Sequence, residues 1–505
     1  MKRVFIFFAF SLLFTTRGWA QATGRSTFLR DSLDIYVNKA LTQWRVPGLA
    51  ICIVKDGRIV LMKGYGTREL GLQERIDENT LFMLGEITEA FTTTAFAKLE
   101  ANKTLSLNDK ITRYLPSFKL DNKASEVTIN DLLTHRAGFK TNQGNFTFYN
   151  TSLTTQQVID KIGHIKPVYP FRATYGYTNS AYAVAAEVIP KVTGRPWYIY
   201  LKESLFIPLG MNNTLPLSQE LPLVLNRTVP HTIVEGRLTP IPYPQLDNLA
   251  AGLSISSTMG DMSKWMMALL NNGKVGARQV IPEIAIKTTL HELTGNQPSA
   301  STQENEQFGL GWFLQDYAGR NLVMRNGKVS GYSSSITLVP QENLGILIMT
   351  NTDKNELPEA LRWQILDTYF NFPYHNYSDS YLDRYKANDA NEQQVKRRMR
   401  DSVFLNPPPA QALVNYTGRY VNDVYGHVNV SVGEGNTLEM RLEHHPKMFV
   451  KLQPMGGNRF YATFSEPIYG KSAFTFVYQA GRITSVRIKV SDAVETDAYD
   501  FKKID

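Results

Sequence analysis

The chain has 505 residues, of which 43% are hydrophobic and 20% are charged, a composition typical of a folded globular protein and not of a disordered or fibrous one. Its net charge of +8 is mild for this length, and no basic run with interleaved aromatic residues accompanies it, so nucleic-acid binding is not expected. The single cysteine, Cys52, excludes an internal disulfide and a cysteine-rich metal site. Because Cys52 lies in the apolar run 50–54, we predict that it is a small core residue.

The first residues carry the pattern of an export signal. Lys2 and Arg3 precede an apolar run from Val4 to Phe14, which is too short to span a bilayer. Small residues follow this run, as they do before a signal-peptide cleavage site. We therefore expect a signal peptide over residues 1–22, a mature chain with no membrane span, and a periplasmic or secreted location.

Hydrophobic periodicity predicts an α/β (α+β) domain. Apolar residues recur at helical spacing from Leu29 to Trp44, and two apolar runs flank the turn at Asp56-Gly57. Farther along the chain, the pattern predicts a helix from about residue 85, a hairpin over 334–351 and a helix over 358–370. Helices enclosed between two hairpins indicate an antiparallel sheet that is flanked by helices and assembled from both ends of the domain.

The character of the sequence changes after a polar, helix-prone segment at 383–400. Three consecutive prolines at 407–409 then forbid regular structure. Beyond them, short alternating runs between residues 427 and 490 predict an all-β module, either a barrel or a sandwich. We expect a large domain over 23–378, a helical and proline-rich linker over 379–409, and a C-terminal β-domain over 410–505.

Short motifs follow one another through the larger domain. They read FMLG at 82–85, DLLTHRAG at 131–138, YTN at 177–179, FGLGW at 308–312 and GKVSGY at 327–332. In this order they resemble the serine β-lactamase-like family, which includes class C β-lactamases, D,D-peptidase-type penicillin-binding proteins and related esterases. The resemblance covers about residues 28–375 and implies that family's fold. The C-terminal module resembles the small β-domain often appended to such hydrolases.

The family's S-x-x-K motif is replaced in this chain. In the family, Ser attacks the acyl carbonyl and Lys, one helical turn later, accepts its proton. The four corresponding positions here read Glu86-Ile87-Thr88-Glu89, and neither another S-x-x-K nor a G-x-S-x-G occurs elsewhere in the sequence. Carboxylates therefore occupy both positions, and we expect Glu86 and Glu89 to be inactive in the family's chemistry.

The two other family motifs are partly kept. Tyr177-Thr178-Asn179 retains Tyr-x-Asn, in which the resemblance implies that Tyr shuttles a proton and Asn donates a hydrogen bond to the ligand's amide. The third motif, Lys/His-x-Gly in the family, reads Arg325-Asn326-Gly327. Arginine keeps the positive charge that would bind a substrate carboxylate, but it is always protonated and cannot shuttle protons. The resemblance thus implies one retained catalytic candidate, Tyr177, and the ligand-binding candidates Asn179, Arg325, Gly327 and Lys328.

The charges of the cleft are expected to be exchanged, not merely lost. Glu86 and Glu89 lie one helical turn apart, and two ionised carboxylates in a partly dry cleft are costly unless they are paired. The facing strand supplies Arg325 and Lys328. We therefore predict an ion pair across the cleft between Arg325 and either Glu89 or Glu86.

Three histidines are interpreted as structural. Thr134-His135 is typical of a turn, and His444-His445 has no acidic or cysteine partner at ligand spacing, which favours a solvated strand end. We expect no metal site and no cofactor.

Three functions remain open from the sequence. The first is an exported pseudoenzyme that binds a ligand or partner in the old active-site cleft, such as a small molecule or a peptide resembling those of peptidoglycan. The second is an esterase or peptidase with a rewired mechanism that uses Tyr177, Thr88 or a Glu-activated water. The third is a scaffold that acts through the C-terminal β-domain. The oligomeric state is left open.

Overall fold

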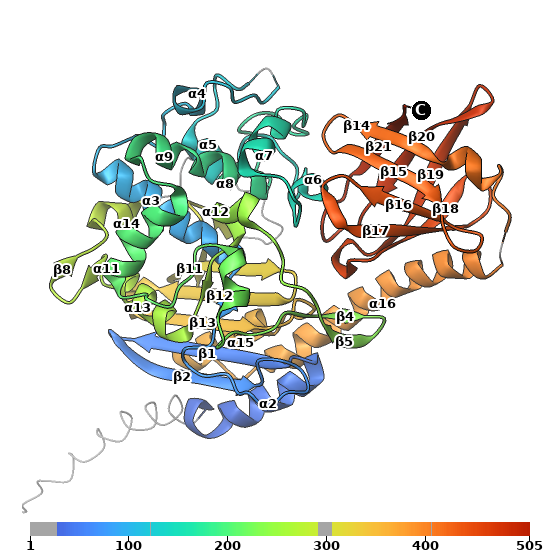
Figure 1. The fold of residues 1–505 in the computed structure, drawn as a ribbon. Helices are drawn as coiled ribbons and strands as arrows, with labels where there is room; N and C mark the ends of the chain where they lie inside the picture. The colour runs from blue at the N-terminus through green and yellow to red at the C-terminus, as the bar shows by residue number, and fades with distance from the viewer. Residues whose placement is uncertain (1–27, 122, 291–305, 406, 505) are drawn as a thin grey trace, which may run out of the picture.

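The computed structural model describes residues 28–121, 123–290, 306–405 and 407–504. An α/β domain lies beside a C-terminal barrel, and one long helix runs between them (Figure 1). The signal-peptide prediction falls on residues outside the described part of the chain.

The larger domain is built on a seven-stranded antiparallel sheet with the order β2-β1-β13-β12-β11-β10-β9. Its strands are β1 (Gly48–Lys55), β2 (Arg58–Gly66), β9 (Glu306–Phe308), β10 (Phe313–Tyr317), β11 (Arg320–Val329), β12 (Tyr332–Val339) and β13 (Leu344–Thr350). Strand β1 from the first hairpin pairs with β13 from the late hairpin, so that Leu49 lies opposite Thr350. The prediction of one sheet assembled from both ends of the domain is confirmed.

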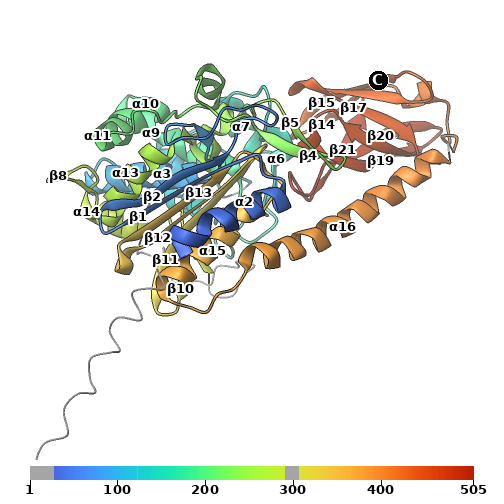
Figure 2. The same ribbon diagram turned by 90° about the horizontal axis from the view of Figure 1, so that it is seen from below.

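Alternation along β1 divides the interior into two layers. Leu49, Ile51 and Ile53 pack with α2 (Leu33–Trp44) and α15 (Leu357–Phe370), which cover one face of the sheet (Figure 2). The residues between them, including Cys52, face the helices of the other side. Burial raises the pKa of the Cys52 thiol to about 12. Cys52 is the core residue that the sequence predicted.

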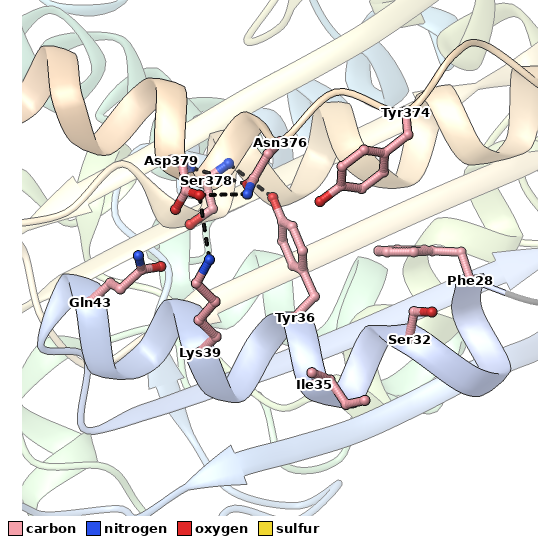
Figure 3. A pocket seen from close by; sticks show the side chains of 10 residues that line it. All are labelled: Phe28, Ser32, Ile35, Tyr36, Lys39, Gln43, Tyr374, Asn376, Ser378 and Asp379. Atoms are coloured by element: carbon pink, nitrogen blue, oxygen red, sulfur yellow. Dashed lines mark hydrogen bonds and ion pairs between the residues drawn. The ribbon is translucent and has the colours of Figure 1, made fainter.

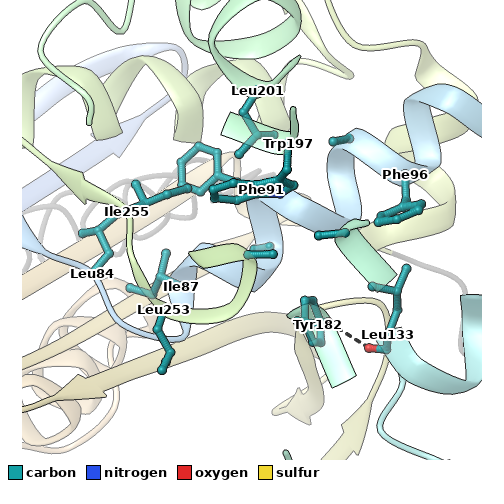
Figure 4. Packing of buried hydrophobic residues seen from close by; sticks show 14 of the residues in the cluster. Leu84, Ile87, Phe91, Phe96, Leu133, Tyr182, Trp197, Leu201, Leu253 and Ile255 are labelled. Atoms are coloured by element: carbon teal, nitrogen blue, oxygen red, sulfur yellow. Dashed lines mark hydrogen bonds between the residues drawn. The ribbon is translucent and has the colours of Figure 1, made fainter. Parts of the chain in front are cut away.

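The second layer is centred on α3 (Ile87–Ala101), which is buried on nearly every side (Figure 4). The Phe91 ring stacks on Trp265 with 3.7 Å between centroids, and the Thr92 hydroxyl donates to the Ala251 carbonyl at 2.7 Å. Polar contacts also fix the surrounding helices, as where the Tyr182 hydroxyl donates to the Leu133 carbonyl at 2.8 Å. The start of α3 is therefore held firmly against the sheet.

Short helices and strand pairs complete this domain. The helices are α4 (Ile111–Tyr114), α5 (Ile129–Leu133), α6 (Asn145–Phe148), α7 (Thr155–Ile162), α8 (Asn179–Ala186), α9 (Val188–Thr193), α10 (Trp197–Leu201), α11 (Ile207–Leu209), α12 (Ala250–Leu253), α13 (Met259–Leu270) and α14 (Glu283–Leu290). The strand pairs are β3 (Phe82–Met83) with β6 (Ser256–Ser257), β4 (His231–Val234) with β5 (Arg237–Pro240), and β7 (Lys274–Val275) with β8 (Arg278–Gln279).

The polar segment predicted to be helical forms α16 (Tyr377–Phe404). Its first turn is fixed to α2, because the Tyr36 hydroxyl accepts from the Ser378 N–H at 2.9 Å and Lys39 lies 3.5 Å from Asp379 (Figure 3). A cavity of about 380 Å³ lies at this junction. Among the described residues, no helix combines the length and the apolar character needed to cross a membrane.

The C-terminal module is a closed antiparallel barrel. Its eight strands are β14 (Gly418–Asn422), β15 (Gly426–Val432), β16 (Leu438–Leu442), β17 (His445–Pro454), β18 (Arg459–Phe464), β19 (Lys471–Gln479), β20 (Arg482–Lys489) and β21 (Ala498–Lys503). Strands β14 and β21 pair with each other, with Tyr420 opposite Lys503, and so close the barrel. Of the two architectures expected, the barrel is correct, and these two strands were not foreseen.

The barrel docks on the larger domain through α6. The Phe146 ring stacks on Tyr425 of the barrel with 4.7 Å between centroids. Beside it, the His445 imidazole is buried and makes hydrogen bonds with the hydroxyls of Tyr425 at 2.6 Å and Tyr469 at 2.8 Å. Burial lowers the pKa of His445 to about 3. The prediction of a solvated strand end is therefore wrong for His445, because this end of β17 meets α6, and His444 beside it is only partly exposed.

A buried carboxyl group bridges the two units. Glu495 accepts hydrogen bonds from the backbone N–H groups of Gly144 at 2.8 Å and Phe146 at 2.9 Å, and from the Tyr499 hydroxyl at 2.9 Å. Burial raises the pKa of this carboxyl from 4.5 to about 7, against the effect of these donors. Ionisation of Glu495 thus opposes the folded state.

We expect this carboxyl to make stability depend on pH. Its contribution is fully present below about pH 4.5 and is lost as the pH rises through about 7, because the raised pKa favours the protonated folded form. Relative to Glu495→Gln, the free energy of unfolding of the unmodified protein should fall by about 3 kcal/mol over this range, measured by urea denaturation. The exposed Glu434→Gln is the control. Parallel pH profiles for the unmodified protein and Glu495→Gln would contradict the expectation.

Candidate functional site

The candidate site forms where the start of α3 meets β11. The contact is close enough to require glycine on both sides. Gly85 has φ +60°, and a Cβ there would lie 2.7 Å from the Lys328 nitrogen. A Cβ on Gly327 would lie 1.8 Å from the Leu84 carbonyl oxygen. Gly327, a predicted ligand-binding residue, therefore has a demonstrable packing role here.

The predicted ion pair across the cleft is present, and it joins Arg325 to Glu89. The Arg325 Nη2 donates to Glu89 Oε2, and its Nε donates to the Glu86 carbonyl oxygen at 3.2 Å. Glu89 is 0% exposed and Arg325 is 2% exposed. Burial opposes the charge of Arg325, but the Glu89 carboxylate raises the pKa of the guanidinium above its ordinary value. The pair is therefore a fully buried salt bridge.

Aromatic rings enclose the guanidinium group. Its carbon lies 5.1 Å from the ring centroid of Phe308, 5.5 Å from that of Phe313 and 5.8 Å from that of Tyr177. These distances are within the range of cation–π attraction. The rings keep water from the ion pair, which strengthens the attraction and raises the cost of removing either partner.

His135 also belongs to this cluster, which the sequence did not indicate. Its backbone makes the predicted turn, with the N–H donating to Leu132 at 3.2 Å. Its buried imidazole reaches Glu89, with Nε2 3.4 Å from Oε2, while Nδ1 accepts from the Thr178 N–H at 3.4 Å. Burial lowers the pKa of His135, so the ring is neutral and donates its single N–H to Glu89. The histidine in the DLLTHRAG motif was the sequence signal that could have identified His135 as a site residue.

Glu86 contacts Arg325 through its backbone carbonyl, but its side chain is not part of the ion pair, and the residue is half-buried. Its Oε2 accepts a hydrogen bond from the Lys328 backbone N–H, which fixes the side chain against β11. Burial raises the pKa of this carboxyl above its ordinary value. The position of the family's nucleophile therefore holds a carboxyl group that is anchored to the facing strand.

The Tyr-x-Asn motif is directed toward the same place. The Tyr177 hydroxyl donates to Asn179 Oδ1 at 2.5 Å, and Asn179 Nδ2 donates to Asn145 Oδ1 at 3.2 Å. Burial raises the pKa of Tyr177 well above 10. Its hydroxyl therefore stays protonated near neutral pH and is suited to donating a hydrogen bond, not to accepting a proton.

Thr88, a candidate of the rewired mechanism, is turned away from these groups. Its side chain is buried, and its Oγ1 accepts a hydrogen bond from the Ile255 N–H at 3.2 Å. This contact explains why a polar residue is tolerated inside α3.

A cavity of about 450 Å³ opens above this constellation. Of the predicted site residues, Glu86, Tyr177, Asn179 and Lys328 line it. Asn145, Tyr149 and Ser330 add further amide and hydroxyl groups. Glu89 and Arg325 are buried and are not among the residues that line it. The structure thus brings the predicted residues together but separates them into a buried ion pair and a cavity wall. No cluster of histidine, cysteine, aspartate or glutamate suited to a metal ion is found among the described residues.

We expect the buried ion pair to dominate the local energetics. Glu89→Gln or Arg325→Gln alone should lower the free energy of unfolding by about 3–5 kcal/mol, because each leaves an unpaired buried charge. The double variant should lose much less than the sum, as measured by a double-mutant cycle in urea.

The exposed pair Lys123–Glu126, with 2.9 Å between its charged atoms, is the control for this cycle. Its coupling should be about 0–1 kcal/mol. If the coupling between Glu89 and Arg325 is no larger than that, the buried pair does not hold the cleft together.

Comparison with known proteins identifies families and proteins that are similar to this chain. A model of the family described as β-lactamase matches residues 33–370, and a model of a domain of unknown function, DUF3471, matches residues 405–504. The unguisins hydrolase ungD' of Aspergillus campestris is 25% identical over 431 residues, which cover 80% of this chain and 78% of that protein. Protein flp of Staphylococcus aureus is 27% identical over 355 residues, which cover 67% of this chain and 66% of that protein.

Among solved structures, the octameric penicillin-binding protein homologue from Pyrococcus abyssi is similar to this chain with a TM-score of 0.58 and 20% identity. The match covers 93% of this chain and 99% of that one, so it extends over both the α/β domain and the barrel. This likeness concerns the fold.

Proposed function

The chain belongs to the β-lactamase family, and we propose that it is an exported, non-catalytic member, which binds a ligand in the family's cleft without transferring an acyl group. The ligand is a small molecule or a short peptide of the kind found in peptidoglycan.

The observation that carries this proposal is the pairing of Glu89 with Arg325. Glu89 takes the place of the lysine that would accept the nucleophile's proton, and its carboxylate is fully engaged with the guanidinium. Glu86 takes the place of the nucleophilic serine. A carboxylate is a poor acyl acceptor in water, because the mixed anhydride hydrolyses or reverts. Neither half of the nucleophile–base pair is present.

The contacts of the cleft argue against most forms of a rewired hydrolase. Thr88 is buried away from the cavity, and the Tyr177 hydroxyl has a strongly raised pKa. Glu86, which reaches the cavity, is the group that could activate a water molecule. This form of the alternative is tested by comparing the unmodified protein with Glu86→Gln.

The remaining polar groups suit binding. Tyr177, Asn179 and Asn145 form a hydrogen-bonded row along the cavity, and Lys328 also lines it. Amide and hydroxyl groups placed in this way can bind an amide or carbonyl without any chemical step.

We expect no turnover of nitrocefin or of p-nitrophenyl acetate above background, and no difference between the unmodified protein and Glu86→Gln. The substitutions Glu86→Ser and Glu89→Lys together should still give no activity, because the new lysine would lie against Arg325. Adding Arg325→His removes that repulsion and should give measurable turnover. Robust hydrolysis by the unmodified protein that is lost in Glu86→Gln would establish the rewired hydrolase instead.

Binding is tested with muropeptides, the disaccharide–peptide fragments of peptidoglycan, by the shift they cause in the melting temperature. We expect stabilisation that disappears in Asn388→Trp, because Asn388 of α16 lines the cavity. The control is Ala390→Trp, which is exposed on the same helix and lies outside the lining. Equal stabilisation of both variants would place the binding site elsewhere.

A further inference from the structure

We propose that the C-terminal barrel is a working part of the ligand site, because it walls the cleft and selects ligands by their width. The inference rests on the proposed function, since it concerns the ligand that the cleft holds.

Three separate parts of the chain enclose the cavity of about 450 Å³. The α/β domain supplies the floor with Glu86 and Tyr177, and α16 supplies Tyr385, Asn388 and Glu392. The barrel supplies Ile468, Ala493 and Val494. Without the barrel, one side of the cleft would be open to solvent.

Hydrogen bonds between the barrel and the start of α6 fix the barrel wall to the cleft. Val494 lines the cavity, and the next residue, Glu495, binds the backbone N–H groups of Gly144 and Phe146. Asn145, between those two residues, lines the cavity and accepts the hydrogen bond from Asn179. Asn145 is the first residue of α6, which lies at the edge of the larger domain that faces the barrel (Figures 1 and 2). The wall and the binding groups are therefore held by the same contacts.

The lining of the cavity combines two kinds of chemistry. The barrel contributes the apolar side chains of Ile468, Ala493 and Val494, whereas the larger domain contributes the amides of Asn145 and Asn179. A ligand that fills this space needs one edge that forms hydrogen bonds and one apolar edge, as an extended short peptide with small side chains has. A broad ligand would meet the barrel before it reached the floor.

The test uses an introduced thiol at the floor of the cleft. Glu86→Cys provides this thiol, and the buried Cys52 gives no background because burial raises the pKa of its thiol to about 12. The thiol is labelled with a small reagent, iodoacetamide, and with a broad one, fluorescein-5-maleimide. The rates are measured by intact-protein mass spectrometry on the full chain. Because the readout is labelling and not turnover, a wrong assignment of the non-catalytic function would leave this result unchanged.

Two substitutions change the wall in opposite directions. We expect Ala493→Trp to slow labelling by fluorescein-5-maleimide roughly tenfold while the rate with iodoacetamide changes little. Ile468→Ala should speed labelling by the broad reagent. The control is Ala498→Trp, at an exposed alanine of the same barrel outside the cavity.

The proposal is overturned if Ala493→Trp and Ala498→Trp give the same rates with both reagents while Ile468→Ala has no effect. It is also overturned if iodoacetamide does not label Glu86→Cys, because the cavity would then not reach the floor. Ala493 is exposed, so its substitution does not enter the barrel core, and Ile468→Ala gives an independent readout if the larger residue perturbs folding.

Discussion

The buried salt bridge between Glu89 and Arg325 is the interaction on which the cleft depends. Two fully buried charges are tolerated because each neutralises the other and aromatic rings exclude water around them. The pair connects the start of α3 to β11 at the contact where Gly85 and Gly327 allow the two backbones to meet. The positions where the family carries out proton transfer are thus occupied by a buried salt bridge.

The neighbours of the pair follow from the same constraint. His135 is neutral and gives its one N–H to Glu89, so it adds a donor without adding a charge. Glu86 is held instead by the Lys328 backbone N–H and faces the cavity. The cleft therefore has two parts. One is the buried ion pair, and the other is the open surface whose side chains can form hydrogen bonds with a ligand. This division is consistent with the proposed binding role.

Local patterns in the sequence predicted much of the fold. Asp56-Gly57 identified the first hairpin, because both residues adopt the positive φ that such a turn requires. The cost of unpaired carboxylates predicted that Arg325 pairs with Glu89 or Glu86, and the structure pairs it with Glu89. Strands β14 and β21 were missed because each is short and alternates weakly, and their pairing with β15, β20 and each other becomes apparent only in the folded barrel.

The contacts that depend on distant parts of the chain could not be foreseen. The sequence around His445 suggests exposure, but the Phe146 ring of α6 stacks on the imidazole with 5.9 Å between centroids. The Tyr149 carbonyl, which is 296 residues away in the chain, also contacts the imidazole. His135 likewise meets Glu89 only when α3 and the turn after α5 pack together. Periodicity and charge reveal which groups need partners, whereas the tertiary fold decides which partners they find.

The central claim is that this cleft binds without forming an acyl-enzyme. It is tested most directly by intact-protein mass spectrometry after prolonged exposure to benzylpenicillin and to a fluorophosphonate. The account predicts that the mass of the protein does not change with either reagent. A stoichiometric adduct on Glu86, Thr88 or Tyr177 would contradict it.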